Sequence, residues 1–206
     1  MFKRTSGFIL LILLVITGIG SQVSNTTLEA KERRILVEQL KETKNAFLKS
    51  TKELSEAQLN FKSSNDKWSI KECMQHIALA EKGLWSVADG ALKLPANAVR
   101  RSEIKITDEE ISKVGNDRTA KQQAPESLKP GNAKWKSANE IKESFKEDRA
   151  ALIKYVKTTT LDVRNHVTDL AVGPVDAYQV MLLIAAHSDR HIQQIEEIKR
   201  DPKFPK

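Results

Sequence analysis

Two of the four histidines, His187 and His191, lie four residues apart in the run AHSDRH at 186–191. In an α-helix, side chains at i and i+4 leave the same face, about 6 Å apart along the axis. Such a pair can present two imidazole nitrogens to one metal ion. The alternative is a pair of core histidines, because both rings fall on an apolar stripe where each needs a hydrogen-bond partner. The run is not the zinc-protease signature, because Ser188 stands where that signature needs Glu.

A third histidine, His76, borders the apolar stripe of an earlier segment, next to Ile77 and three residues after Cys73. If the two segments pack together, three imidazoles meet at one divalent cation and leave coordination positions open for water or substrate. We therefore predict a metal site on His76, His187 and His191. Three imidazoles suit Zn, Ni, Fe or Mn nearly alike, and zinc is expected from its frequency.

Other reactive side chains are assigned simpler roles. We expect His166 to be a solvated loop residue and Cys73 to be a buried, unreactive thiol. A metal-activated water needs a general base nearby, and the candidates by position are Glu72, Asp189 and Gln194. None of them is a strong candidate, because Glu72 has a role in helix capping and Asp189 lies off the histidine face.

Four long segments carry the apolar spacing of amphipathic helices and must position these side chains. Ser69 with Glu72, and Ser137 with Glu140, form capping-box patterns at two of the starts, and Trp68 is expected to plug the entry of the Ser69 helix. The first predicted helix spans about Thr27–Leu54. The second begins at Ser69, the third begins at Ser137, and the fourth runs from near Pro174 to Asp201.

The connection between the second and third segments, about Leu94–Lys136, is long. A third capping-box pattern, Thr107 with Glu110, predicts a short helix over Asp108–Lys113 within it. A connection of this length is what a crossover between parallel helices of a bundle requires. No period-two pattern of strands stands out. The sequence thus predicts an all-α four-helix bundle with a long crossover between helices 2 and 3.

The first twenty residues have the layout of a secretory signal peptide. Lys3 and Arg4 precede the apolar run Phe8–Ile19, and the small residue Gly20 is followed by polar sequence from Ser21. The run is short against the roughly 20 residues that cross a bilayer, although an uncleaved anchor is the alternative. We expect a signal peptide at 1–20 and one domain at 21–206, exported to the periplasm or medium, with no stable membrane insertion after cleavage.

The charge composition of the chain bears on whether it binds nucleic acid. The chain has 206 residues, with 34 Lys and Arg against 27 Asp and Glu, and its single Cys excludes an internal disulfide. The basic residues are interspersed with acidic ones, as on ordinary solvated helix faces. A nucleic-acid-binding protein would usually show a denser basic stripe with aromatic residues between the bases. We therefore expect no nucleic-acid partner.

Two motifs resemble those of the DinB/YfiT-like superfamily. The run KWSIKE at 67–72, followed by HI at 76–77 and AE at 80–81, is similar to its second-helix motif. The run HSDRHIQQI at 187–195 is similar to its closing motif, His-x-x-x-His with Arg before the second His. The resemblance covers about Leu28–Pro205. It implies a four-helix bundle with a long crossover and a divalent metal held by His76, His187 and His191.

The activities that the resemblance implies are varied: S-transferases that use low-molecular-weight thiols, a mycothiol-dependent isomerase, and metal-dependent hydrolases. Export makes a reduced thiol cosubstrate scarce, which leaves metal-assisted hydrolysis of a small-molecule substrate as the favoured reaction. The alternative is a non-catalytic domain that binds a metal or ligand. Members of the family often pair, so a homodimer is also expected.

Overall fold

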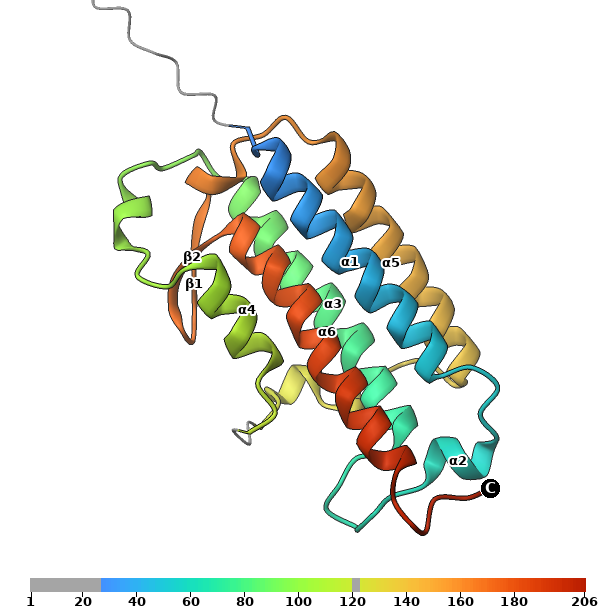
Figure 1. Ribbon diagram of the computed structural model, residues 1–206. Helices are drawn as coiled ribbons and strands as arrows, with labels where there is room; N and C mark the ends of the chain where they lie inside the picture. The colour runs from blue at the N-terminus through green and yellow to red at the C-terminus, as the bar shows by residue number, and fades with distance from the viewer. Residues whose placement is uncertain (1–26, 120–122) are drawn as a thin grey trace, which may run out of the picture.

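Four helices form the body of the molecule in a computed structural model that describes residues 27–119 and 123–206. They are α1 (Ala30–Ser50), α3 (Ile70–Leu92), α5 (Ala138–Thr158) and α6 (Ala177–Lys199). Helices α1 and α6 run in one direction along the bundle, and α3 and α5 run in the opposite direction (Figure 1). The connection between α3 and α5 therefore joins parallel neighbours, which confirms the predicted four-helix bundle and its crossover. The predicted signal peptide lies outside the described residues.

Side-chain caps fix where two of these helices begin. Ser69 Oγ accepts a hydrogen bond from the Glu72 N–H at 3.2 Å, and the Glu72 carboxylate accepts one from the Ser69 N–H at 2.7 Å. At α5, Ser137 Oγ accepts from the Glu140 N–H, but the Glu140 carboxylate reaches back to the Lys136 N–H instead. The starts of α3 and α5 agree with the predicted helix starts at Ser69 and Ser137. These caps satisfy amide groups that have no partner within the helix.

A β-hairpin precedes α6. No strand was predicted there, and the hairpin also moves the start of the last helix. Strands β1 (Val167–Leu170) and β2 (Gly173–Asp176) pair antiparallel through a two-residue turn, with Gly173 at φ 103°. Pro174 lies in β2, so the predicted start of the last helix near Pro174 was wrong. The helix begins at Ala177, where the Asp176 carboxylate accepts from the Gln179 N–H. Strands of four residues are too short to show a period-two pattern, and proline is tolerated in an edge strand.

The crossover contains α4 (Asp108–Asn116), which begins at the predicted Thr107–Glu110 capping box and runs three residues beyond the predicted end. Helix α4 packs along α6 (Figure 1). The contact is close at Gly115, where an added Cβ would lie 2.8 Å from side-chain atoms of both Ala186 and Leu183. The remaining short elements are α2 (Glu56–Asn60) and the 3₁₀ turns η1 (Arg100–Glu103), η2 (Glu126–Leu128), η3 (Pro130–Asn132) and η4 (Val163–Asn165).

The core consists of two apolar clusters. In each of the four helices, one of the polar residues that lie in sequence between the members of the two clusters joins a hydrogen-bonded group centred on Arg149. The Arg149 guanidinium makes two 2.6 Å hydrogen bonds to the Glu81 carboxylate and also donates to Thr43 Oγ1 and Ser188 Oγ. We call Thr43, Glu81, Arg149 and Ser188 the polar layer. Because each helix contributes one member, the layer fixes how the four helices align along the bundle.

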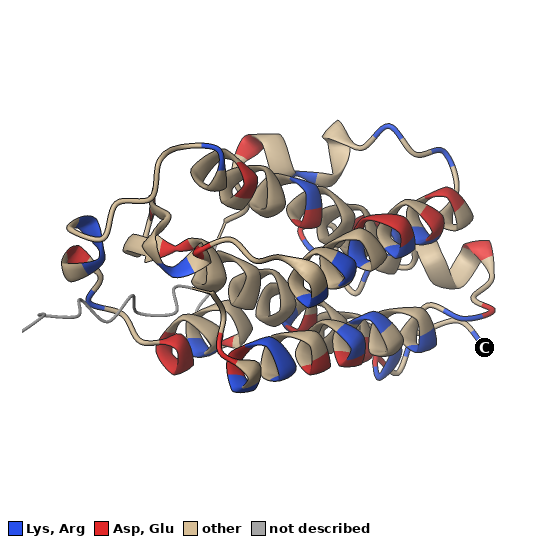
Figure 2. Cartoon of the chain, turned by 90° about the horizontal axis from the view of Figure 1, so that it is seen from above, with Lys and Arg blue, Asp and Glu red and all other residues tan. Residues whose placement is uncertain are grey.

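The outer faces of the helices carry interspersed charges. Blue and red segments alternate along them in Figure 2, and several ion pairs, such as Arg34 with Glu38 and Lys146 with Glu143, join exposed side chains. Across residues 27–119 and 123–206, no helix has the length and apolar character to cross a membrane.

Candidate metal centre

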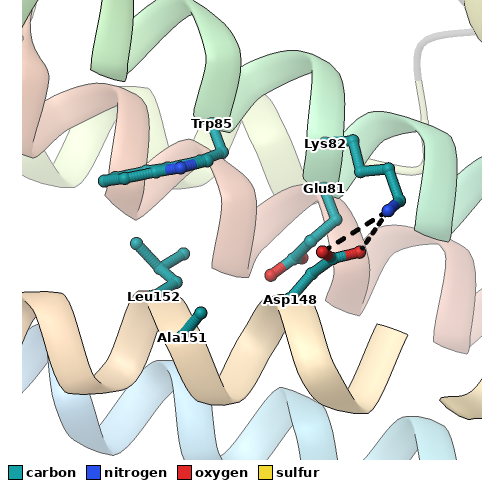
Figure 3. A pocket seen from close by; sticks show the side chains of 6 residues that line it. All are labelled: Glu81, Lys82, Trp85, Asp148, Ala151 and Leu152. Atoms are coloured by element: carbon teal, nitrogen blue, oxygen red, sulfur yellow. Dashed lines mark hydrogen bonds and ion pairs between the residues drawn. The ribbon is translucent and has the colours of Figure 1, made fainter. Parts of the chain in front are cut away.

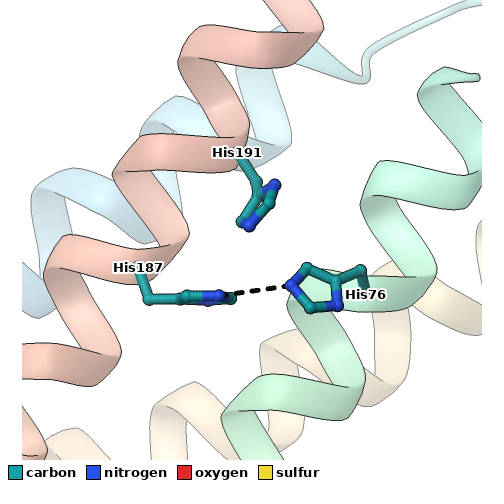
Figure 4. A group of neighbouring side chains, drawn as sticks. All are labelled: His76, His187 and His191. Carbon is teal, nitrogen blue, oxygen red and sulfur yellow. Dashed lines mark hydrogen bonds between the residues drawn. The ribbon is translucent and has the colours of Figure 1, made fainter. Parts of the chain in front are cut away.

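The packing of α3 against α6 brings three imidazole rings together. His76 points from α3 toward His187 and His191, which project from successive turns of α6 (Figure 4). One nitrogen from each ring lies within 4.8 Å of the other two. The His76 and His187 Nε2 atoms are 3.2 Å apart, close to the edge of about 3.3 Å that two nitrogens at 2.0–2.1 Å from a tetrahedral ion would span. The three residues could therefore hold a metal ion.

Hydrogen bonds on the outer side fix two of the rings. The Leu128 carbonyl oxygen lies 2.8 Å from His76 Nδ1 and can only accept, so this Nδ1 carries the proton. Gln194 Oε1 lies 2.9 Å from His191 Nδ1 and accepts in the same way. Each bond leaves Nε2 without a proton. The His76 Nε2 lone pair then accepts a hydrogen bond from His187 Nε2–H at 3.2 Å, and a metal ion that displaced this proton could bind there. Metal-binding histidines commonly have such partners, which set the tautomer and the orientation of the ring.

The surroundings keep the rings neutral. Burial, reinforced by the neighbouring imidazoles, lowers the pKa of His191 to about 2 and that of His187 to about 3. Burial also lowers the pKa of His76, although its bond to the Leu128 carbonyl acts in the opposite direction. All three rings are therefore neutral at neutral pH, with one nitrogen unprotonated, and metal coordination requires this state.

Trp68 forms one wall of the centre. Its ring centroid lies 4.8 Å from that of His76 and 5.8 Å from that of His191. His76 and His191 are buried, whereas His187 and Trp68 keep part of their surface accessible. The sequence interpretation treated Trp68 only as a plug at the helix entry and missed this contact. Trp68 precedes the Ser69 cap and lies outside the helix, so helical spacing gave no signal for this contact.

The three candidate general bases are engaged elsewhere. The Glu72 carboxylate accepts from the Ser69 N–H and pairs with Lys62 Nζ at 2.8 Å. The Asp189 carboxylate accepts from Gln193 at 2.8 Å, and Gln194 orients His191 as described above. Sequence position alone did not distinguish an orienting role for Gln194 from a role as a base.

The fourth histidine does not join the centre and differs from its predicted environment. His166 is buried rather than solvated, and its Nδ1 donates to the Ala91 carbonyl oxygen at 3.0 Å. The sequence could not show this, because its partner is a main-chain group near the end of α3. Cys73 is buried as predicted, and burial raises the pKa of its thiol far above the ordinary value.

A separate hollow of about 190 Å³ lies between α3 and α5. Trp85 and Leu152 form apolar walls, and Lys82 pairs with Asp148 at 3.1 Å (Figure 3). The Glu81 carboxylate at its inner side is already bonded to Arg149. None of the three clustered histidines lines this hollow.

Comparisons with known proteins agree with the motifs and the topology. The sequence matches the DinB superfamily over residues 39–195. It is 28% identical over 151 residues to the uncharacterised protein YuaE of Bacillus subtilis (strain 168), covering 72% of this chain and 87% of that one. The fold is similar to that of YfiT from Bacillus subtilis, described as a probable metal-dependent hydrolase with an unusual four-helix bundle topology. The TM-score is 0.59 at 13% identity, and the match covers 87% of this chain and 92% of that one.

Proposed function

The chain belongs to the DinB superfamily, and from this premise we propose that it is a metal-dependent enzyme of the hydrolase type. The observation that carries the proposal is the convergence of three neutral imidazoles from α3 and α6, with ligand atoms within 4.8 Å of one another. The description of YfiT as a probable metal-dependent hydrolase supports the same reaction class.

In this proposal His76, His187 and His191 bind one divalent ion through nitrogen. Zinc is the metal expected, with Ni, Fe and Mn as alternatives, because imidazole donors suit all four. When bound, such an ion would lower the pKa of a coordinated water and polarise a substrate carbonyl. The protein contributes a rigid set of three donors, leaving positions for water and substrate, and Trp68 covers one side.

The second candidate function is a non-catalytic domain that binds a metal or ligand at the same histidines. It is favoured by the engagement of Glu72, Asp189 and Gln194, which leaves none of the predicted bases free to take a proton from water. For both candidate functions we also propose that the protein is exported and that it binds a small molecule.

The test is metal content followed by turnover. Protein purified without chelator should carry about one equivalent of divalent metal by elemental analysis, and His187→Ala should lose it. His166→Ala is the matched control, because His166 is a buried histidine outside the cluster. Hydrolysis of simple esters or amides that disappears in His187→Ala supports the enzyme. Stoichiometric metal without turnover on any of these substrates supports the binding domain. Metal-free wild-type protein contradicts the enzyme and the metal-binding domain, and leaves only a domain that binds another ligand.

A further inference from the structure

The crossover contributes directly to the candidate metal centre through one residue of η2. The carbonyl oxygen of Leu128 accepts the hydrogen bond from His76 Nδ1 at 2.8 Å. The Cδ2 atom of the same residue lies 3.1 Å from the position that a Cβ on Gly83 would occupy. His76 and Gly83 are seven residues apart and so share one face of α3. Leu128 therefore contacts α3 with its main chain and its side chain, about two turns apart.

We propose that Leu128 is a positioning residue for the metal centre. Its side chain, packed on the backbone at Gly83, holds the carbonyl that keeps the His76 proton on Nδ1 and leaves Nε2 as the unprotonated nitrogen that can accept from His187 or bind a metal. The link to metal affinity rests on the proposed function. The position of the His76 proton does not, because it is a property of the metal-free chain.

The reasoning depends on what holds η2 against α3. The main-chain bonds of this turn, from Leu128 to Pro125 and from Lys129 to Glu126, lie within the turn itself. They give it shape but do not attach it to the helix. The contacts of Leu128 attach η2 itself, and the next turn, η3, packs against α3 beside it. The glycine matters because a side chain at position 83 would occupy the place that Leu128 takes.

The consequence for His76 follows from imidazole chemistry. A neutral ring can carry its proton on either nitrogen, and the hydrogen-bond partner decides which. If the Leu128 carbonyl moves away, the proton is free to move to Nε2, and a protonated Nε2 cannot bind a metal. Loss of such an outer partner typically lowers metal affinity by about 10- to 100-fold.

We call the contact between the Leu128 side chain and the backbone at Gly83 the seat. Two variants disturb it, one from each side of the contact. Leu128→Ala removes the side chain but keeps the carbonyl, and Leu128 is only half-buried, so the main core is untouched. Gly83→Leu fills the seat instead. Gly90→Leu is the matched control, because Gly90 lies on the same helix with nothing within 4 Å of an added Cβ. Leu128→Met is the conservative variant, since it keeps the volume.

Two readouts are measured on each protein: the ¹⁵N shifts of the His76 ring in metal-free protein, and the affinity for Zn²⁺ by competition with a chelator. Wild type, Gly90→Leu and Leu128→Met should show the Nδ1–H form. Leu128→Ala and Gly83→Leu should show a share of the Nε2–H form and bind Zn²⁺ about 10- to 100-fold more weakly. A merely structural role for Leu128 would not move the ring proton.

The proposal is overturned if both seat variants keep the Nδ1–H form and a Zn²⁺ affinity within twofold of wild type. If one of them fails to fold, the other decides. If wild-type protein binds no Zn²⁺, the proposed function fails, but the ring spectra of the metal-free proteins still decide the role of Leu128.

Discussion

At the scale of single residues, the histidine cluster combines buried rings with strongly lowered pKa values. The pKa of His187 is lowered to about 3 and that of His191 to about 2, against an ordinary value of 6.5 that applies in the unfolded chain. Between these values the unfolded state binds protons that the folded state does not. The metal-free protein must therefore lose stability as the pH falls below about 6.5.

We expect the free energy of unfolding of EDTA-treated protein to drop by about 2 kcal/mol for each of these two rings between pH 7.5 and pH 5.0. Urea unfolding at the two pH values measures it. The double variant His187→Gln/His191→Gln removes both titrating groups. Its free energy of unfolding should therefore drop less than that of wild type, by the contribution of the two rings. An equal decrease in wild type and variant would show that these rings are not the source.

The identity of the clustered residues could be read from the sequence, whereas their orientation could not. The four-residue spacing alone places His187 and His191 on one helical face. His76 could be predicted because it borders the apolar stripe of its own helix. What orients His76 is a carbonyl 52 residues away, at Leu128. A main-chain acceptor has no residue-type signature, and the same reason explains why the buried environment of His166 was missed.

At the scale of elements, the polar layer holds the four helices in one alignment. Arg149 and Glu81 are fully desolvated, with side-chain exposures of 0% and 2%. Removing one member of such a pair leaves a buried charge without compensation, which typically costs about 3–5 kcal/mol.

We therefore expect Glu81→Gln and Arg149→Met each to lower the free energy of unfolding by about 3–5 kcal/mol. The double variant Glu81→Leu/Arg149→Met should lose less than the sum of the two, because no buried charge remains. Denaturant unfolding of all three gives the comparison. Lys82→Met is the matched control, because its ion pair with Asp148 joins the same two helices in water and should matter by less than about 1 kcal/mol.

The contact of α4 with α6 supplies a second test at this scale. Gly115→Ala puts a methyl group 2.8 Å from atoms of Ala186 and Leu183, so the helices must separate, at a cost of about 1–3 kcal/mol. Gly90→Ala has open space and should stabilise α3 by up to about 1 kcal/mol. The melting temperatures should therefore move in opposite directions, and a rise in both would show that α4 can shift freely.

The long helices were predictable because their apolar spacing and caps are local signals, as the capping boxes at Ser69 and Thr107 show. The hairpin of β1 and β2 was not. Its strands are four residues long, and their pairing depends on tertiary contacts rather than on a repeating pattern. The start of α6 was misplaced for the same reason, since Pro174 suits a first helical turn and an edge strand equally well.

At the scale of the whole molecule, membership of the DinB superfamily is established, while export and pairing remain predictions. We expect the mature protein to begin at or near Ser21, because the apolar run of residues 8–19 is short and is followed by small and polar residues. Mass spectrometry of protein recovered from its native cells measures the N-terminus. A chain that still begins at residue 1 would instead support the uncleaved anchor.

The contact of Trp68 with two of the imidazoles, at tilted ring planes, has a practical consequence. An indole in contact with His76 and His191 reports optically on those rings, because its emission is sensitive to whether a neighbouring imidazole is protonated or bound to an ion. The molecule thus carries its own spectroscopic probe. Substituting Trp85 and Trp135 with phenylalanine would leave Trp68 as the one tryptophan of the chain. Its emission intensity could then follow metal occupancy of the centre in real time without any added label.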